Sequence, residues 1–327
     1  MLTSTMDAGP DSRGSELEGQ SSTDPAESSG RIALMLRRVS SHFIRKPHDV
    51  KSRLELAILL LLLAPAPSKA IDLKPETVEA WDAYVLAAKL RMERRAGGQA
   101  PFLWVDEERE LAQRARAGEI LVEPVDGDSP HPVPRGLIHD WIGAVFVPKV
   151  TLDEALGVLS DYEHYKDFYK PMVAKSRLLA QTPSHEKVTL LMVQTDYSVT
   201  AAVETENEVD IARPDANRAY SLSKSARVQE IANYGQSSEH AFPEDHGPGY
   251  VWRTFTVTRV EERDGGVYIE MELIGLSRGI PWAFRWLIQP LAERLPRNIL
   301  RATMNETRDA LNQRINAITS KTPVVTY

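Results

Sequence analysis

The sequence contains no cysteine among its 327 residues. This absence excludes disulfide bonds, thiolate catalysis, cysteine-ligated metal ions and lipid anchors attached to cysteine. It does not indicate a compartment, because a chain without cysteine is compatible with oxidising and with reducing surroundings.

The sequence also lacks an excess of basic residues. The chain has 39 Lys and Arg residues against 46 Asp and Glu residues, a net charge of -7. Proteins that bind nucleic acid need a basic surface to neutralise phosphates, and no C2H2, RNP-type or basic-zipper pattern is present. We therefore exclude nucleic acid as a partner. The hydrophobic share of 42% and the charged share of 26% are ordinary for a soluble globular protein.

The N-terminal part has the composition of a leader. Residues 1–34 contain almost no large apolar side chain and are predicted to be disordered. Residues 35–70 pass from basic to apolar to small residues, with Ser68 and Ala70 at the -3 and -1 positions of a cleavage site. This order predicts a secretory signal peptide and an exported protein, periplasmic or extracellular. The alternative is an uncleaved anchor at residues 54–66, although its apolar run is shorter than the ~20 residues of a spanning helix.

Residues 71–134 are predicted to be a helical extension followed by a linker. The extension has one apolar helical stripe, formed by Val78, Trp81, Val85, Ala88 and Met92. It is too short to hold a large core, so we expect it to pack on the domain that follows. Residues 119–124 predict a short strand, and the proline-rich residues 126–134 indicate a boundary.

Residues 135–316 predict a strand, two short helices, about six antiparallel strands and a long C-terminal helix, with a flexible tail at 317–327. Met271 and Leu273 alternate with Glu270 and Glu272, which predicts a sheet with one dry face and one face in water. After Pro296 a helical stripe follows, made of Ile299, Leu300, Met304, Leu311 and Ile315. This helix is the only element long enough to cover the dry face, so the fold class is α+β.

Residues 156–173 (LGVLSDYEHYKDFYKPMV) carry a resemblance. They are similar to the two short helices and proline of the START-like (SRPBCC) superfamily, which includes polyketide cyclase, coenzyme Q-binding and Bet v 1-like groups. Gly279-Ile-Pro281 and Leu295-Pro296 before the last helix also fit. The resemblance covers roughly 136–316 and implies a helix-grip fold, a curved sheet of about six or seven strands around the C-terminal helix. It also implies an internal cavity for lipids, isoprenoids, polyketides or other apolar molecules.

We therefore predict a protein that binds or sequesters a hydrophobic small molecule or lipid in that cavity. The expected lining consists of inward strand and helix positions, namely Tyr197, Val199, Ala201, Phe255, Met271, Leu273, Trp286, Ile299, Leu300 and Met304. Arg253 shares a face with Phe255 and would anchor a carboxylate or phosphate if that face points inward. If the Trp252 face points inward, Arg253 is solvated. His139 and Asp140 pose the same choice, because only one of them points inward.

Two motifs suggest other chemistry. Gly275-Leu-Ser277-Arg-Gly279 matches the nucleophile elbow of α/β-hydrolases, but no histidine follows it and the strands before it are antiparallel. We interpret it as a turn. His240, Asp245 and His246 suggest a metal site, but a solvated loop is the simpler interpretation. We predict no catalytic residue, no metal and no cofactor.

Two alternative functions remain. A cyclase or dehydratase-type enzyme would use the same cavity, with Arg253, His139 or Asp140 as its polar groups. A structural envelope protein would fill the cavity with its own side chains. An aromatic wedge precedes the last helix, at Trp282, Phe284 and Trp286. It either closes the end of the sheet or forms an apolar lip that makes transient contact with a membrane.

The leader is testable by mass spectrometry of the native protein purified from its host. We expect a mature N-terminus at Ile71, because cleavage after Ala70 removes the whole leader. A protein that keeps residues 54–66 and fractionates with membranes would instead favour the anchor.

Overall fold

The computed structural model of the chain describes residues 72–196, 199–280 and 285–321, with side chains for 72–195, 200–280 and 294–314. The predicted leader, the signal peptide, the end of the tail and the residues Tyr197, Trp282 and Phe284 lie outside the described residues. Of the helices that the described residues form, none combines the length and apolarity that a membrane crossing requires.

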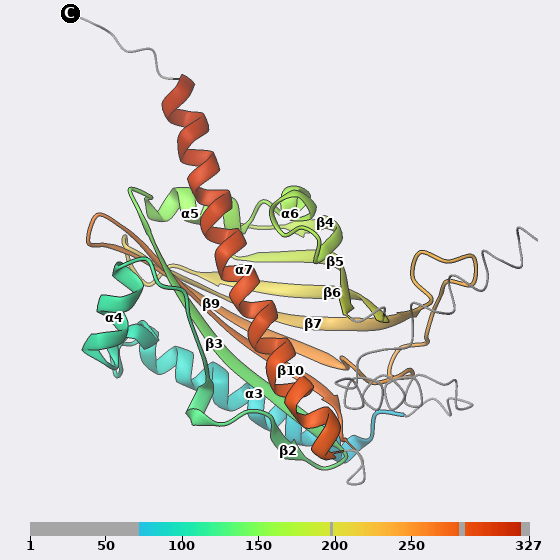
Figure 1. Cartoon of the computed structure of the whole chain (residues 1–327). Helices are drawn as coiled ribbons and strands as arrows, with labels where there is room; N and C mark the ends of the chain where they lie inside the picture. Colours follow the sequence, from blue (N-terminus) through green and yellow to red (C-terminus); the bar gives the residue numbers. More distant parts are fainter. Residues whose placement is uncertain (1–71, 197–198, 281–284, 322–327) are drawn as a thin grey trace, which may run out of the picture. The chain divides into compact units, whose positions relative to one another are not determined.

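One antiparallel sheet organises the described residues (Figure 1). Its main strands lie in the order β1-β3-β10-β9-β7-β6-β5-β4, with β2 paired to β3 and β8 paired to β7. Their bounds are β1 Leu121–Pro124, β2 His131–Val133, β3 Gly136–Pro148, β4 Val173–Gln181, β5 His185–Asp196, β6 Val199–Ala212, β7 Arg218–Ala232, β8 His240–Ala241, β9 Arg253–Arg263 and β10 Gly266–Arg278.

The sheet therefore has ten strands where six or seven were predicted. The additional strands are short: β1 and β2 come from residues assigned to the extension and linker, and β8 comes from the loop after β7. β1 and β2 pair with β3 alone, so they widen one edge of the sheet and leave the predicted strand order intact.

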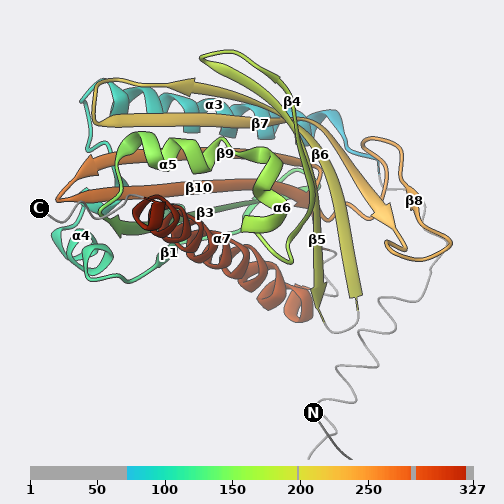
Figure 2. The same cartoon turned by 90° about the horizontal axis from the view of Figure 1, so that it is seen from above.

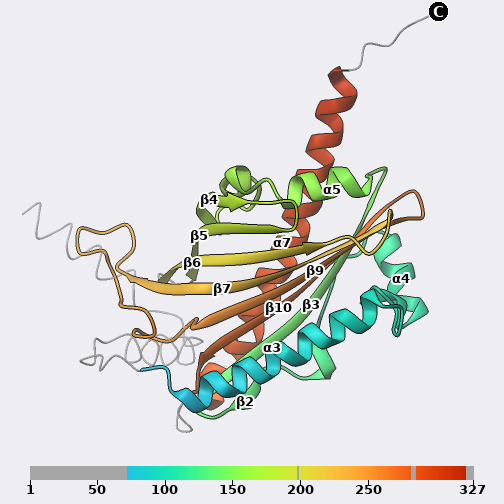
Figure 3. The ribbon, with the colours of Figure 1, turned by 180° about the vertical axis from the view of Figure 1, so that it is seen from behind.

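Helices lie on both faces of this sheet. On the N-terminal side they are α3 Pro75–Ala96, η1 Trp104–Asp106, α4 Arg109–Arg116 and η2 Val125–Gly127; between β3 and β4 they are α5 Leu152–Leu159, η3 Tyr162–His164 and α6 Tyr165–Phe168; and α7 Arg285–Lys321 follows β10. We call the face that carries α5, α6 and α7 the inner face and the face that carries α3 the outer face (Figures 2 and 3).

Local sequence accounts for several of these elements. Thr151 and Glu154 form a capping box at the start of α5, with Glu154 N donating to Thr151 Oγ1 at 3.3 Å and Thr151 N donating to Glu154 Oε2 at 2.9 Å. The β9–β10 turn has positive φ at Asp264 and Gly265, as a two-residue hairpin turn requires. The spacing of Ser160 and Glu163 predicts a second capping box, and this prediction is wrong. Ser160 instead ends α5, and η3 begins without a side-chain cap.

The inner face is closed by α7 lying on β3. Leu300 and Met304 are buried against Gly143, where a Cβ atom would lie 3.0 Å from Leu300 Cγ and 3.1 Å from Met304 Cγ. Glycine at 143 therefore lets the helix approach the strand closely. The predicted helix stripe on the sheet is confirmed at these positions, and the helix starts earlier than predicted, at Arg285.

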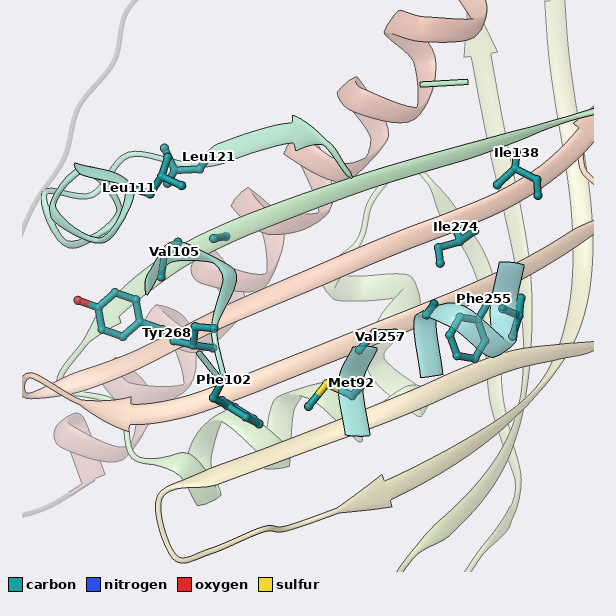
Figure 4. Packing of buried hydrophobic residues seen from close by; sticks show 14 of the residues in the cluster. Met92, Phe102, Val105, Leu111, Leu121, Ile138, Phe255, Val257, Tyr268 and Ile274 are labelled. Atoms are coloured by element: carbon teal, nitrogen blue, oxygen red, sulfur yellow. The ribbon is translucent and has the colours of Figure 1, made fainter. Parts of the chain in front are cut away.

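The outer face is closed by the extension. Trp81, Val85, Ala88 and Met92 of α3 share a hydrophobic core with Phe255, Val257, Ile274 and Leu276 of the sheet (Figure 4). As predicted, the extension packs on the domain. The expectation that Glu270 and Glu272 face water is wrong, because the extension covers them and leaves them 0% and 5% exposed.

The element order of strand, two short helices, antiparallel strands and a long C-terminal helix on the sheet is the one predicted. The protein is α+β with a helix-grip fold, to which the extension adds a layer on the outer face.

The close approach at Gly143 gives a stability prediction. Gly143→Val should lower the free energy of unfolding by about 1–3 kcal/mol, because its side chain must displace Leu300 and Met304. The measurement is urea unfolding of the full chain. Gly275→Val is the matched control, since no described atom lies within 4 Å of a Cβ at that position. Equal losses from both variants would contradict the packing argument.

Candidate functional site

The inner face is covered unevenly. α7 packs chiefly on β3, with smaller contacts to β1, β10, α5 and α6. Farther across the sheet, the inner-face side chains of Met271 and Leu273 on β10 and of Thr256 on β9 are only partly buried. The inner face beyond α7 is thus the part of the sheet where a ligand would meet side chains that still touch solvent.

Serine and threonine line this part of the inner face. The group consists of Thr254, Thr256 and Thr258 on β9 and Ser221, Ser223 and Ser225 on β7, and we call it the hydroxyl band. Its members face each other across the strands: Thr258 pairs with Ser221 and Thr256 with Ser223. Ser225 Oγ accepts from Thr254 N at 2.9 Å and donates to the Thr254 carbonyl at 3.2 Å, which fixes that end of the band.

The parity of the strands places the band on the inner face. Val260 of β9 and Ala219 of β7 lie in the core beneath α5 and α7, and the band follows them at every second residue. The intervening residues Phe255 and Val257 lie in the outer core. Each band hydroxyl is both a donor and an acceptor, and covering one without a hydrogen bond costs about 1–3 kcal/mol.

Apolar side chains border the band on β10. Met271 is paired with Thr258 and Leu273 with Thr256, and on the next strand Trp141 is paired with Leu273. The face therefore combines an apolar border with a polar floor, as small-molecule sites do.

Beside the band lies a small cavity of about 30 Å³. It is lined by residues of α5, η3 and the sheet, namely Leu156, Leu159, Ser160, Tyr162, Val209, Ile211, Tyr220, Ser221, Thr258 and Val260. That volume suits about one water molecule. A larger ligand would have to extend from it along the hydroxyl band.

Gly275 lies at the other end of the same face. It is paired with His139 on β3 and with Thr254 on β9, and no described atom lies within 4 Å of the position that a Cβ would occupy. A glycine inside a strand often marks a place where another group approaches the backbone. Here the described residues leave that place open.

The structure also brings together two residues that the sequence argument kept apart. His139 Nε2 lies 2.9 Å from Ser277 Oγ, because β3 and β10 are neighbours. No histidine follows Ser277 in the chain, and its partner His139 precedes it by 138 positions, so the nucleophile-elbow pattern does not predict this pair. The backbone N–H groups that follow Ser277 are already used, Arg278 N by the Gly249 carbonyl and Gly279 N by the Arg135 carbonyl. Neither is free to stabilise an oxyanion, so the pair does not form a hydrolase site.

The predicted lining residues divide into three groups. Met271, Leu273 and Ala201 lie on the inner face, as do Leu300 and Met304, which are buried on β3, and Ile299 is half-buried. The structure describes no side chain for Val199 or Trp286. Phe255 and Arg253 do not lie on the inner face.

The placement of Phe255 and Arg253 is thus a correction. Phe255 is fully buried beneath α3, with Lys89 Nζ 5.8 Å from its ring centre. Arg253 Nη1 and Nη2 donate to the two carboxylate oxygens of Asp245 at 2.5 and 3.1 Å, so Arg253 is not an anchor inside the site. The reason is that α3 makes the outer face dry, and the apolar residues of β9 therefore point outward.

The choice left open between His139 and Asp140 is resolved, since Asp140 points outward while His139 points inward. It lies in a buried polar cluster between the sheet and the extension, where it accepts from Tyr84 Oη at 2.8 Å. Arg91 of α3 donates to Glu272 at 2.8 Å. Arg259 donates to Glu270, which also accepts from the backbone N–H groups of Trp104 and Val105. This cluster attaches α3 and η1 to the outer face.

The remaining motif, in the loop after β8, does not form a shared site. Asp245 is bound to Arg253, and His246 Nε2 lies 3.4 Å from Asp72 Oδ1. No group of three or more metal-ligating side chains occurs in the described part of the chain.

Comparisons with known proteins give matches at the level of structure alone. No family model and no curated protein matches the sequence. A STAR-related lipid transfer protein from Xanthomonas axonopodis is 18% identical over 57% of this chain and 100% of its own, with a TM-score of 0.39. Human STARD10 is 9% identical over 65% of this chain and 81% of its own, with a TM-score of 0.38. The Zhui aromatase/cyclase from Streptomyces sp. R1128 is 15% identical over 55% of this chain and 98% of its own, with a TM-score of 0.36.

These likenesses say nothing of what this chain binds. The order and pairing of its own elements give it the START-like helix-grip fold that the sequence predicts. The site has to be argued from the residues of the inner face.

The buried cluster generates a prediction about pH. Burial and, to a smaller extent, the nearby Glu272 raise the pKa of Asp140 to about 8, against the opposing effects of Tyr84 and Arg91. The unfolded carboxyl titrates near pH 4, so between about pH 4 and 8 the folded protein binds the additional proton. Stability should therefore fall as pH rises through this interval.

Asp140→Asn removes the titrating carboxyl group and keeps the shape of the side chain. Relative to the unmodified chain, the variant should show a shallower fall in the free energy of unfolding, by up to about 1.4 kcal/mol for each pH unit. Urea unfolding at pH 5, 6, 7 and 8 measures the difference. Parallel curves for both proteins would show that Asp140 does not titrate in this interval.

Proposed function

We propose that the protein binds an apolar or amphipathic small molecule on the inner face, in the space bounded by α7 and the strands β10, β9 and β7, and that it acts after export. The observation that carries the binding proposal is the uneven cover of this face. α7 packs chiefly on β3, while Met271, Leu273 and the hydroxyl band except Ser225 stay partly exposed.

Sequestration is the mechanism that this geometry supports. Apolar ligand surface that leaves water against Met271 and Leu273 contributes roughly 25 cal/mol per Å². This gain in binding free energy does not require a reacting group. It requires only that the sheet already holds the side chains of the inner face in place. The proposal of export is based on the leader sequence. Transient membrane contact through Trp282, Phe284 and Trp286 is likewise a proposal based on the sequence.

The competing proposal is a structural envelope protein that binds no ligand. The small volume of the cavity beside the hydroxyl band, about 30 Å³, favours it. The enzyme alternative is weaker, because two of its three polar groups, Arg253 and Asp140, do not lie on the inner face. His139, beside Ser277, is its remaining group.

Filling the inner face tests the binding proposal. Leu273→Trp should reduce binding of a fluorescent isoprenoid probe to the delipidated full chain at least tenfold, because the larger ring occupies the face that the ligand would cover. The measurement is a fluorescence titration, with circular dichroism to verify folding.

Leu86→Trp is the matched control. Leu86 lies on α3 and is 56% exposed, so the same substitution there should leave probe binding unchanged. Native mass spectrometry of the protein from its host supplies a second measurement. If no small molecule copurifies and no probe binds, the protein does not have the proposed function.

A further inference from the structure

The residues of the inner face also indicate what kind of molecule fits. Building on the proposed function, we propose that the ligand is an uncharged ring compound with several oxygen substituents, held by hydrogen bonds to the hydroxyl band and to the indole N–H of Trp141. The proposal names the chemistry of the ligand, which the fold leaves open.

The first observation is the density of hydroxyl groups. Thr256 and Thr258 of β9 face Ser223 and Ser221 of β7, so four hydroxyl side chains form two neighbouring cross-strand pairs. Neighbouring strands lie about 4.8 Å apart, and side chains on one face repeat about every 7 Å along a strand. A purely aliphatic chain laid over this grid would strip water from the hydroxyl groups without replacing its hydrogen bonds.

The second observation is an indole N–H without a partner. Trp141 is 7% exposed, and its Nε1 atom is buried with no hydrogen-bond partner among the described residues. The side chain lies on the inner face of β3, in the same cross-strand row as Leu273, Thr256 and Ser223. A buried donor of this kind is costly unless an acceptor meets it. A carbonyl or ether oxygen of a ligand would supply the acceptor.

The third observation concerns charge. The band and its border contain no Lys, Arg, Asp or Glu, and the cation expected there, Arg253, is bound to Asp245. Carboxylates lie at the edges of this face, and Arg278 is near one of them, Glu230. Glu230 accepts backbone N–H groups of residues 249–251, and Glu186 accepts from Tyr162 and Gln181. Glu306 of α7 has a buried carboxylate oxygen without a partner in the described part of the chain. An anionic head group over the band would therefore meet no cation within the band or its border, and carboxylates at the edges.

The space that the described residues leave open at Gly275 lies in the neighbouring cross-strand row. The glycine separates Thr254 from His139, and its missing side chain leaves room over the backbone. A flat ring system needs this room if it is to lie on the sheet and reach the band at the same time.

Three probes separate the ligand classes on the delipidated full chain: naringenin as an uncharged oxygenated ring compound, farnesol as an uncharged chain with one oxygen, and oleate as an anionic chain. Isothermal titration at pH 6.5 gives the affinities. We expect naringenin to bind at least tenfold more tightly than farnesol or oleate.

Variants then assign the effect to the named groups. The double variant Thr256→Val with Thr258→Val should weaken naringenin binding roughly tenfold and leave farnesol binding unchanged or stronger, because it removes two hydroxyl groups and keeps the shape. Thr189→Val, on the outer face of β5, is the control and should change neither affinity.

Trp141→Phe should weaken naringenin binding in the same selective way. Its matched control is Trp252→Phe, since Trp252 is also buried, at 3% exposed, also lacks a described partner for its indole N–H and belongs to the outer core. If the band and Trp141 variants affect naringenin and farnesol equally, or if oleate binds most tightly, the ligand-class proposal is overturned while the binding function stands. If none of the three probes binds and nothing copurifies with the native protein, both proposals fall.

Discussion

The burial of Glu270 and Glu272 beneath the N-terminal extension is the constraint on which the rest of the structure depends. Two carboxylates taken out of water need partners. Arg259 on the neighbouring strand, Arg91 on α3 and the backbone of η1 provide them. Because these contacts hold the extension on the sheet, the outer face of β9 and β10 becomes a hydrophobic core. The inner face of the same strands therefore does not have to be completely buried.

This division explains which parts of the fold follow from the sequence. Strand alternation, the capping box of α5 and the stripe of α7 are local patterns, and the structure has all three. Which face of each strand is buried cannot be determined from the sequence of that strand alone. A period of two residues looks the same from either side, so Phe255 of β9 is expected in the cavity beneath α7 although it packs on α3. The assignment would have required knowing that residues 72–116 cover the sheet.

The candidate site was hidden for the same reason. The alternating threonines of β9 and serines of β7 are visible in the sequence, and they have the composition of strand residues that face water. Only the pairing of β9 with β7 and the cover on the outer face turn them into the floor of a partly enclosed surface. Trp141 and His139 join that surface through strand pairing between residues more than 100 positions apart, which no local pattern encodes.

The pairing of β3 with β10 also has a consequence for how the chain acquires its structure. All thirteen residues of β3 have their partners in Gly266–Arg278, near the end of the chain. α3 likewise finds its apolar partners on β9 and β10. During synthesis, the extension and the first long strand must therefore wait with their apolar side chains uncovered until almost the whole protein has been made. Such long-range topologies fold slowly, so this architecture exposes α3 and β3 to chaperones and to aggregation for longer than a fold built from local contacts would.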